Sequence, residues 1–293
     1  MSTLFRAEWQ KITGHRIVAT LLVWIYPVGA ALMMFMAFIG VLLSDSLRTG
    51  VQQSPPVWTQ QSMILWELVN SEIGRFLLVT FAAFVFAGEY QWGTWKNLIP
   101  RSARVPLILT KYAAFAVLIT VAVLLAVLVI IGGTWLIGAV AGVSPVPALS
   151  DGAAMGDAAG DFVQRGLITM TSAIIAASYA ALGGMLTRSI IGGVIVGLLL
   201  QFAEQGVLLA TALVGQLIPA LRGLVNLYLF TPSYNLSNIG SYAQYDTPFA
   251  IHLGPELVVG PHDLGVSLLI VLAWVVGLIA LVTWLFRRQD ILG

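Results

Sequence analysis

The sequence predicts an all-α integral membrane protein with six transmembrane helices, an N-terminal amphipathic interfacial helix and both termini in the cytoplasm. Hydrophobic residues make up 59% of the 293 positions and charged residues only 9%, which is too little ionic surface for a soluble protein of this length. Six apolar runs are long enough to cross a hydrocarbon layer of ~30 Å. Basic residues gather on alternate connecting segments, which fixes an orientation in the membrane.

The first predicted element is an amphipathic helix within residues 1–16. Leu4, Phe5, Trp9 and Ile12 recur at helical spacing, and polar side chains occupy the rest of the wheel. Such a helix lies on the inner leaflet ahead of the first span. Two roles fit the pattern equally well: a simple orientation anchor, or an elbow that contacts a cytoplasmic partner.

The spans follow along residues 1–293 as one transmembrane domain without an inserted soluble domain. The first run is too long for a secretory signal and is expected to be retained. The second is the shortest, and Glu72 and Arg75 are expected at the outer headgroup level with their stems along the helix. The predicted spans are 17–43, 73–88, 113–141, 166–186, 190–215 and 264–286.

Charge orients these spans. With both termini inside, the inner segments hold ten of the 14 basic residues, and the outer segments hold nine of the 13 acidic ones. This distribution is the positive-inside bias. The inner basic residues are Arg6, Lys11, Arg16, Lys96, Arg101, Arg104, Lys111, Arg188, Arg287 and Arg288, and the outer acidic residues are Asp45, Glu67, Glu72, Asp151, Asp157, Asp161, Asp246, Glu256 and Asp263.

The outer loops differ in composition. The longest, 216–263, is rich in Pro, Gly, Asn and aromatic residues, which is typical of turns and interfacial side chains. We expect short re-entrant or interfacial helices there, with 217–230 the best candidate. The Ala/Gly/Asp-rich stretch 153–160 predicts a mobile connector. Asn235 begins an Asn-Leu-Ser triplet that matches a glycosylation sequon, a motif short enough to arise by chance.

The inner loop 89–112 carries the strongest local pattern, because it is basic, aromatic and interrupted by glycine and proline. Its tryptophans suit interface anchors, and its cations suit pairing with acids on a partner or with lipid phosphate. The simpler interpretation is a basic loop held against headgroups. The candidate docking residues are Trp92, Trp95, Lys96, Arg101 and Arg104.

A spaced set of residues runs through this loop and both chain ends: Glu89, Gly93, Thr94, Lys96, Pro100, Arg104 and Lys111, with Glu8 and Lys11 before the first span and Arg287, Arg288 and Asp290 at the tail. This set resembles the permease subunits of type 2 class ABC exporters, the small six-helix relatives of the G-subfamily transporters. The resemblance implies that the loop and the Glu8–Lys11 pair couple the spans to an ATPase.

The resemblance further implies an export permease that pairs with a second permease copy and two ABC ATPase subunits in the plasma (inner) membrane of a bacterium or archaeon. The chain has no G-x-x-x-x-G-K-[ST] motif, so it is not expected to be an enzyme by itself. ATP and Mg are expected on the ATPase, and this chain is expected to bind no cofactor. A net charge of +1 and no cysteine argue against nucleic-acid binding and thiolate metal sites, which leaves membrane lipid as the other partner.

Glu204 is the one ionisable residue deep inside a predicted span. With Gln201 and Gln205 it forms a polar strip, a candidate substrate pathway, beside the small residues Gly193 and Gly197. A carboxyl at such depth either lines a wet cavity and acts on substrate, or fixes packing at a subunit interface. Two other functions stay open: an ATP-independent secondary transporter or channel with Glu204 as the coupling carboxylate, and a membrane assembly factor.

Overall fold

The computed structural model describes residues 2–15, 23–93, 95, 103–252, 258–259 and 261–289. Within these ranges it contains eleven helices and one small β-hairpin. Six helices are long and apolar enough to cross a membrane, so the chain is a predominantly helical multi-pass membrane protein, as predicted. These six are α3 (Ile25–Leu43), α6 (Glu72–Trp92), α8 (Arg104–Ala141), α9 (Gly152–Thr187), α10 (Ile190–Leu217) and α12 (Leu264–Arg288).

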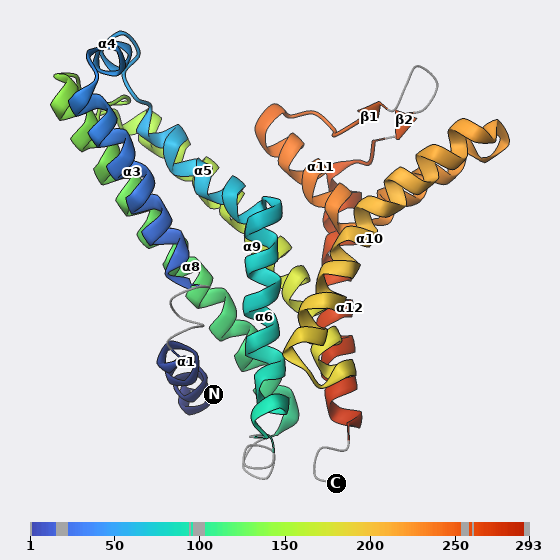
Figure 1. The fold of residues 1–293 in the computed structure, drawn as a ribbon. Helices are drawn as coiled ribbons and strands as arrows, with labels where there is room; N and C mark the ends of the chain where they lie inside the picture. Colours follow the sequence, from blue (N-terminus) through green and yellow to red (C-terminus); the bar gives the residue numbers. More distant parts are fainter. Residues whose placement is uncertain are drawn as a thin grey trace.

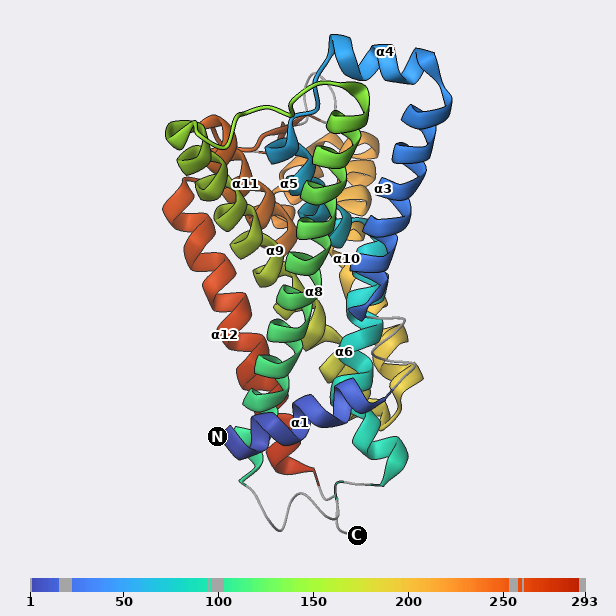
Figure 2. The ribbon, with the colours of Figure 1, turned by 90° about the vertical axis from the view of Figure 1, so that its left-hand side faces the viewer.

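The helices form two arms that separate toward one end of the bundle (Figure 1). One arm holds α3 and α8 with α4 (Asp45–Gln53) and α5 (Trp58–Asn70), and the other holds α10. The first helix, α1 (Ser2–Gly14), lies across the opposite end, where α12 also finishes (Figure 2). We call the end that carries α1 the terminal end. The opposite end, where the arms separate, is called the far end.

Two spans extend well beyond their apolar runs. With 38 residues, α8 is ~57 Å long, and α9 has 36 residues. The prediction of a mobile connector at 153–160 is wrong, because this stretch forms the first turns of α9. Asp151 caps them by accepting a hydrogen bond from the backbone N–H of Ala154 at 3.1 Å, and the alanines favour helix.

The predicted outer loop before the second span is largely helical. In it, α5 runs from the far end toward the middle of the bundle, where α6 begins (Figure 1). Ser71 separates the two helices and caps α6 by accepting a hydrogen bond from the N–H of Gly74. A Cβ on Gly74 would lie 2.1 Å from the carbonyl oxygen of Leu68, so the junction requires glycine. Arg75 therefore lies in the first turn of α6, near the middle of the bundle's length, and its expected place at the outer headgroup level stays a prediction.

The small residues of α10 are used inside the chain. A Cβ on Gly197 would approach a Val79 methyl carbon to 2.8 Å, and one on Gly193 would lie 3.1 Å from the Ala83 Cβ. The glycines therefore let α10 pack closely on α6, and the same face of α10 also contacts α9. They serve contacts within one chain and not a subunit interface.

The long loop before the last span folds into a cap. It contains the 3₁₀ helix η3 (Pro219–Phe230), α11 (Pro232–Tyr245) and a hairpin of β1 (Ile251–His252) and β2 (Val258–Val259). The predicted helical segment is thus present, while re-entry into a membrane stays a prediction. Asn235 is fully buried and donates to two backbone carbonyls, so it does not serve as a glycosylation site in this fold.

Candidate functional site

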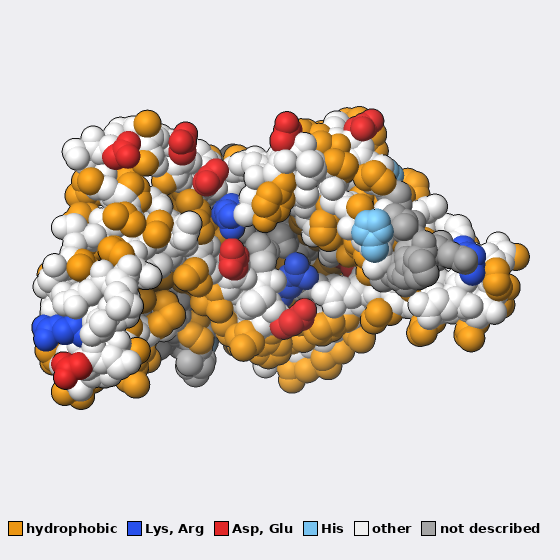
Figure 3. Space-filling model, turned by 90° about the horizontal axis from the view of Figure 1, so that it is seen from above, with side chains coloured by type: hydrophobic (Ala, Val, Ile, Leu, Met, Phe, Trp, Pro, Cys, Tyr) orange, Lys and Arg blue, Asp and Glu red, His pale blue; other side chains and the backbone are white. Residues whose placement is uncertain are grey.

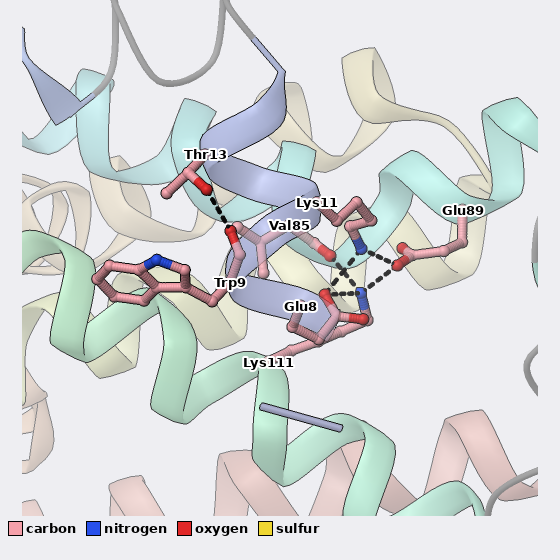
Figure 4. A network of polar contacts seen from close by, with 7 residues as sticks. All are labelled: Glu8, Trp9, Lys11, Thr13, Val85, Glu89 and Lys111. Carbon is pink, nitrogen blue, oxygen red and sulfur yellow. Dashed lines mark hydrogen bonds and ion pairs between the residues drawn. The ribbon is translucent and has the colours of Figure 1, made fainter. Parts of the chain in front are cut away.

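Four charged side chains of alternating sign meet where α1, α6 and α8 converge (Figure 4). The Lys111 Nζ lies 2.5 Å from Glu89 Oε1 and 3.3 Å from Glu8 Oε2. The Lys11 Nζ lies 2.8 Å from Glu8 Oε2 and also contacts Glu89 Oε1. A further hydrogen bond runs from the Lys111 Nζ to the carbonyl oxygen of Val85 at 2.7 Å. We call Glu8, Lys11, Glu89 and Lys111 the charge cluster.

The charge cluster is neutral as a whole and largely buried, although the Lys11 side chain is 32% exposed. The side chains of Glu89 and Lys111 are 0% exposed, and Glu8 is buried as well. Removing ions from water costs several kcal/mol each, which only close opposite charges offset. Because α1 supplies one charge of each sign, its docking adds a neutral pair to the neutral Glu89–Lys111 pair. The cluster therefore ties α1 to both spans.

Lys11 keeps its proton in this setting. Burial alone would favour the neutral amine, but the carboxylates of Glu89 and Glu8 and their hydrogen bonds outweigh it and raise the pKa of Lys11 above its ordinary value. The ammonium therefore persists at neutral and moderately alkaline pH.

The two tryptophans of the predicted inner loop lie in different environments. Trp95 is only 1% exposed, with its ring 4.5 Å from that of Phe286 and 5.3 Å from the Lys111 Nζ. Its side chain joins the charge cluster to α12 and is not a surface anchor. Trp92 is 43% exposed and stacks on His15 at a centroid distance of 5.4 Å, so it is the accessible one.

Arg104 caps the end of α12. Its guanidinium donates to the carbonyl oxygens of Phe286, Arg287 and Gln289 at 3.0, 2.7 and 2.8 Å. The Gln289 side chain in turn accepts from the hydroxyl of Tyr90 and donates to a carbonyl of α9. Arg104 is thus engaged within the chain, and any coupling role it has passes through α12.

The remaining predicted coupling residues are placed only in part. Gly93 ends α6 with a φ of 65°, the left-handed conformation that favours glycine after a helix. Thr94, Lys96 and Arg101 lie outside the described residues.

Glu204 joins three helices. Its Oε1 accepts a hydrogen bond from the hydroxyl of Tyr179 on α9 at 2.6 Å. Its Oε2 accepts from the backbone N–H of Ser233 at 3.0 Å and from the Ser233 hydroxyl at 2.5 Å, both in the first turn of α11. The carboxyl is well supplied with donors at a helix N-terminus, where negative charge is favoured. Its neighbour Gln205 turns away and lies 3.5 Å from Glu72 on α6.

A cavity of about 940 Å³ lies between α5, α9 and α11, with α6 and α10 at its base. Seen from the far end, a hollow with basic and acidic side chains around it lies between the arms (Figure 3). Of the predicted substrate pathway, Gln201 and Glu204 line this cavity. An ion pair of 3.1 Å between Arg165 and Glu67 lies in its wall.

Sequence reasoning missed most residues of the cavity, among them one each on α5, α9 and α6. Trp66 lies on α5, which we predicted as loop, Tyr179 lies in an alanine-rich span, and Arg75 was expected at the membrane surface. The one available signal was Arg75, a charged residue within the shortest apolar run.

Comparisons with protein-family models, curated proteins and solved structures found no match for this chain.

Proposed function

We propose that this chain is the transmembrane permease subunit of an ATP-driven ABC exporter, together with a second permease copy and two ATPase subunits. The observation that carries the proposal is the charge cluster, because it fastens a helix that crosses the terminal end to two spans through buried ion pairs. A permease that is moved by a soluble partner needs such a stiff connection. In this proposal the terminal end is cytoplasmic and the membrane is the plasma (inner) membrane of a bacterium or archaeon.

Motion from an ATPase has two routes into the spans. The first runs through α1 and the charge cluster to α6 and α8. The second runs through Trp95 and Arg104 to the end of α12. The exposed face of Trp92 is the contact we propose for the ATPase.

Export fits the placement of the cavity. It lies in the half of the bundle away from the charge cluster, and the hollow is visible from the far end (Figure 3). With the terminal end in the cytoplasm, a substrate in this cavity lies in the half of the bundle that faces away from the cytoplasm. The chain lacks a phosphate-binding G-x-x-x-x-G-K-[ST] loop, so ATP and Mg belong to the partner subunit and this chain is not an enzyme by itself.

Co-purification from the native host tests the proposal. A tagged chain extracted in mild detergent should recover an ATPase, and Trp92→Ala should weaken that association several-fold. Trp24→Ala is the matched control, because Trp24 is similarly exposed (49%) but lies at the start of α3. Failure of the unaltered chain to recover any ATPase would contradict the exporter.

A second candidate, an ATP-independent transporter, is favoured by one observation: the carboxyl of Glu204 lines the cavity. It predicts substrate movement driven by an ion gradient in liposomes that contain this chain alone. Transport that starts only when the ATPase and ATP are added would exclude it.

A further inference from the structure

Arg75 is a cation at the base of the cavity. Within the described part of the chain its guanidinium forms neither a hydrogen bond nor an ion pair, and its Nε is buried. It lies in the first turn of α6, near the middle of the bundle's length. A guanidinium that is partly shielded from water is more stable with an anionic or polar partner.

Of the residues that the structure describes, four acids line this cavity, Glu67, Asp157, Asp161 and Glu204, and none of them forms an ion pair with Arg75. Glu204 accepts hydrogen bonds from Tyr179 and Ser233, and Glu72 lies within hydrogen-bond distance of Gln205. No carboxylate among the described residues lies within 4.0 Å of Arg75, the distance of an ion pair. The positive charge of Arg75 is therefore available to a molecule in the cavity.

Two further polar groups around the cavity lack partners within the described residues. The indole Nε1 of Trp66 is a buried donor, and the amide Oε1 of Gln201 is a buried acceptor. Buried polar groups are nearly always hydrogen-bonded in folded proteins. Three such groups around one cavity offer hydrogen-bonding positions that water or a polar ligand would fill.

We propose that this cavity binds an organic anion, whose carboxylate, sulfonate or phosphate group pairs with Arg75. A guanidinium presents parallel N–H donors that match the oxygens of such a group. The rest of the ligand has both apolar and hydrogen-bonding surface, because Met63, Ile168 and Leu236 line the cavity together with Asn70, Gln164 and Ser241. A volume of about 940 Å³ suits an organic molecule of drug size or larger. This inference rests on the proposed export function and names its substrate class.

A matched pair of fluorescent probes tests the charge requirement on the full chain in lipid nanodiscs. The probes are 1-anilinonaphthalene-8-sulfonate and N-phenyl-1-naphthylamine, which differ by the sulfonate. We expect Arg75→Gln to weaken sulfonate binding about tenfold to a hundredfold, the usual effect of losing a charged hydrogen-bond partner. Binding of the neutral amine should change less than about twofold, because it makes no ionic contact.

Two variants serve as controls. Arg165→Gln removes a cation from the same cavity that is already paired with Glu67, so it should leave sulfonate binding nearly unchanged. Arg75→Lys keeps the charge but loses the fork of donors, and it should weaken binding several-fold. Because it preserves the cation, it also serves if Arg75→Gln gives no monodisperse protein. Unchanged sulfonate binding in the Arg75 variants, or equal losses for both probes, would overturn the proposal.

The same assay separates two sources of the anion. Octanoate should compete with the sulfonate probe in phosphatidylcholine discs if the site takes a soluble organic anion. If it takes a lipid headgroup, phosphatidylglycerol discs should weaken probe binding in the wild type but not in Arg75→Gln. Failure of both overturns the site. Neither binding test needs an ATPase. Loss of the anion site would therefore leave the co-purification result unaffected, and failure to recover an ATPase would leave the binding result unaffected.

Discussion

Replacement of Glu89 by Gln tests whether the charge cluster works as a balanced set. The substitution keeps the shape of the side chain but removes one of two negative charges, so the cluster goes from neutral to a net charge of +1. Lys111, which is fully buried, then keeps only Glu8 at 3.3 Å as a counterion, together with the Val85 carbonyl.

The expected loss is large because the remaining charge cannot reach water. Removing one partner of a buried ion pair costs about 3–5 kcal/mol. We therefore expect Glu89→Gln to lower the free energy of unfolding by about that amount, measured by denaturant titration of the purified chain in mild detergent. Glu67→Gln is the matched control: it also removes a carboxylate from an ion pair, but Glu67 is 68% exposed and its loss should hardly change stability.

A second substitution makes the test sharper. Lys111→Met in the Glu89→Gln background returns the cluster to neutrality, because Glu8 and Lys11 remain as a pair at 2.8 Å. The double variant should therefore be more stable than Glu89→Gln alone, although it carries one more change. A double variant whose loss equals the sum of the two single losses would refute the argument from charge balance.

Three further predictions concern the α5–α6 junction, the Glu204 contacts and the protonation of Lys11. Gly74→Ala should lower the melting temperature, because its Cβ would lie 2.1 Å from a carbonyl oxygen of α5. Gly132→Ala in α8 is the control, because its Cβ would meet nothing within 4 Å and the melting temperature should not change. Equal shifts in the two variants would argue against a tight junction. Glu204→Gln should cost about 1–3 kcal/mol of unfolding free energy, because it replaces charge-assisted hydrogen bonds from Tyr179 and Ser233 with weaker neutral ones. Unchanged stability in a denaturant titration would count against these contacts. Because the pKa of Lys11 is raised, the stabilisation it gives is complete below the ordinary value of 10.5 and is lost only at higher pH. A spin label on α1 should therefore keep its mobility from about pH 6 to about pH 9, and release of α1 within that range would contradict the raised value.

The spans were predictable because crossing a hydrocarbon layer requires an apolar run that composition reveals. The ends of the spans were not predictable, because α8 and α9 continue beyond their apolar runs. Hydropathy does not detect the capping residues and helix-favouring residues that extend a helix through a polar stretch. The boundary between α5 and α6 at Ser71 was not predicted for a related reason. Two helices that meet at a junction look like a loop and a short span when only apolar length is counted.

Residue types of the candidate sites were visible in the sequence, but their contacts were not. Glu8, Lys11, Glu89 and Lys111 were each named, yet nothing local indicates that residues 78 or 103 positions apart share one buried cluster. Trp95 was predicted at a surface because tryptophan beside basic residues is typical of interfaces, and its packing on Phe286 depends on the tertiary fold.

One helix joins the two sites, and this bears on how they would work together. Glu89 in the charge cluster and Arg75 at the cavity both belong to α6, fourteen residues or ~21 Å apart along its axis. An α-helix transmits displacement with little loss, whereas the junction at Ser71 and Gly74 separates α6 from α5. A push on α1 therefore reaches Arg75 through α6 without having to move α5, which carries Trp66 on the cavity wall. In the proposed exporter, this shift of Arg75 relative to Trp66 is the change that would release a bound anion.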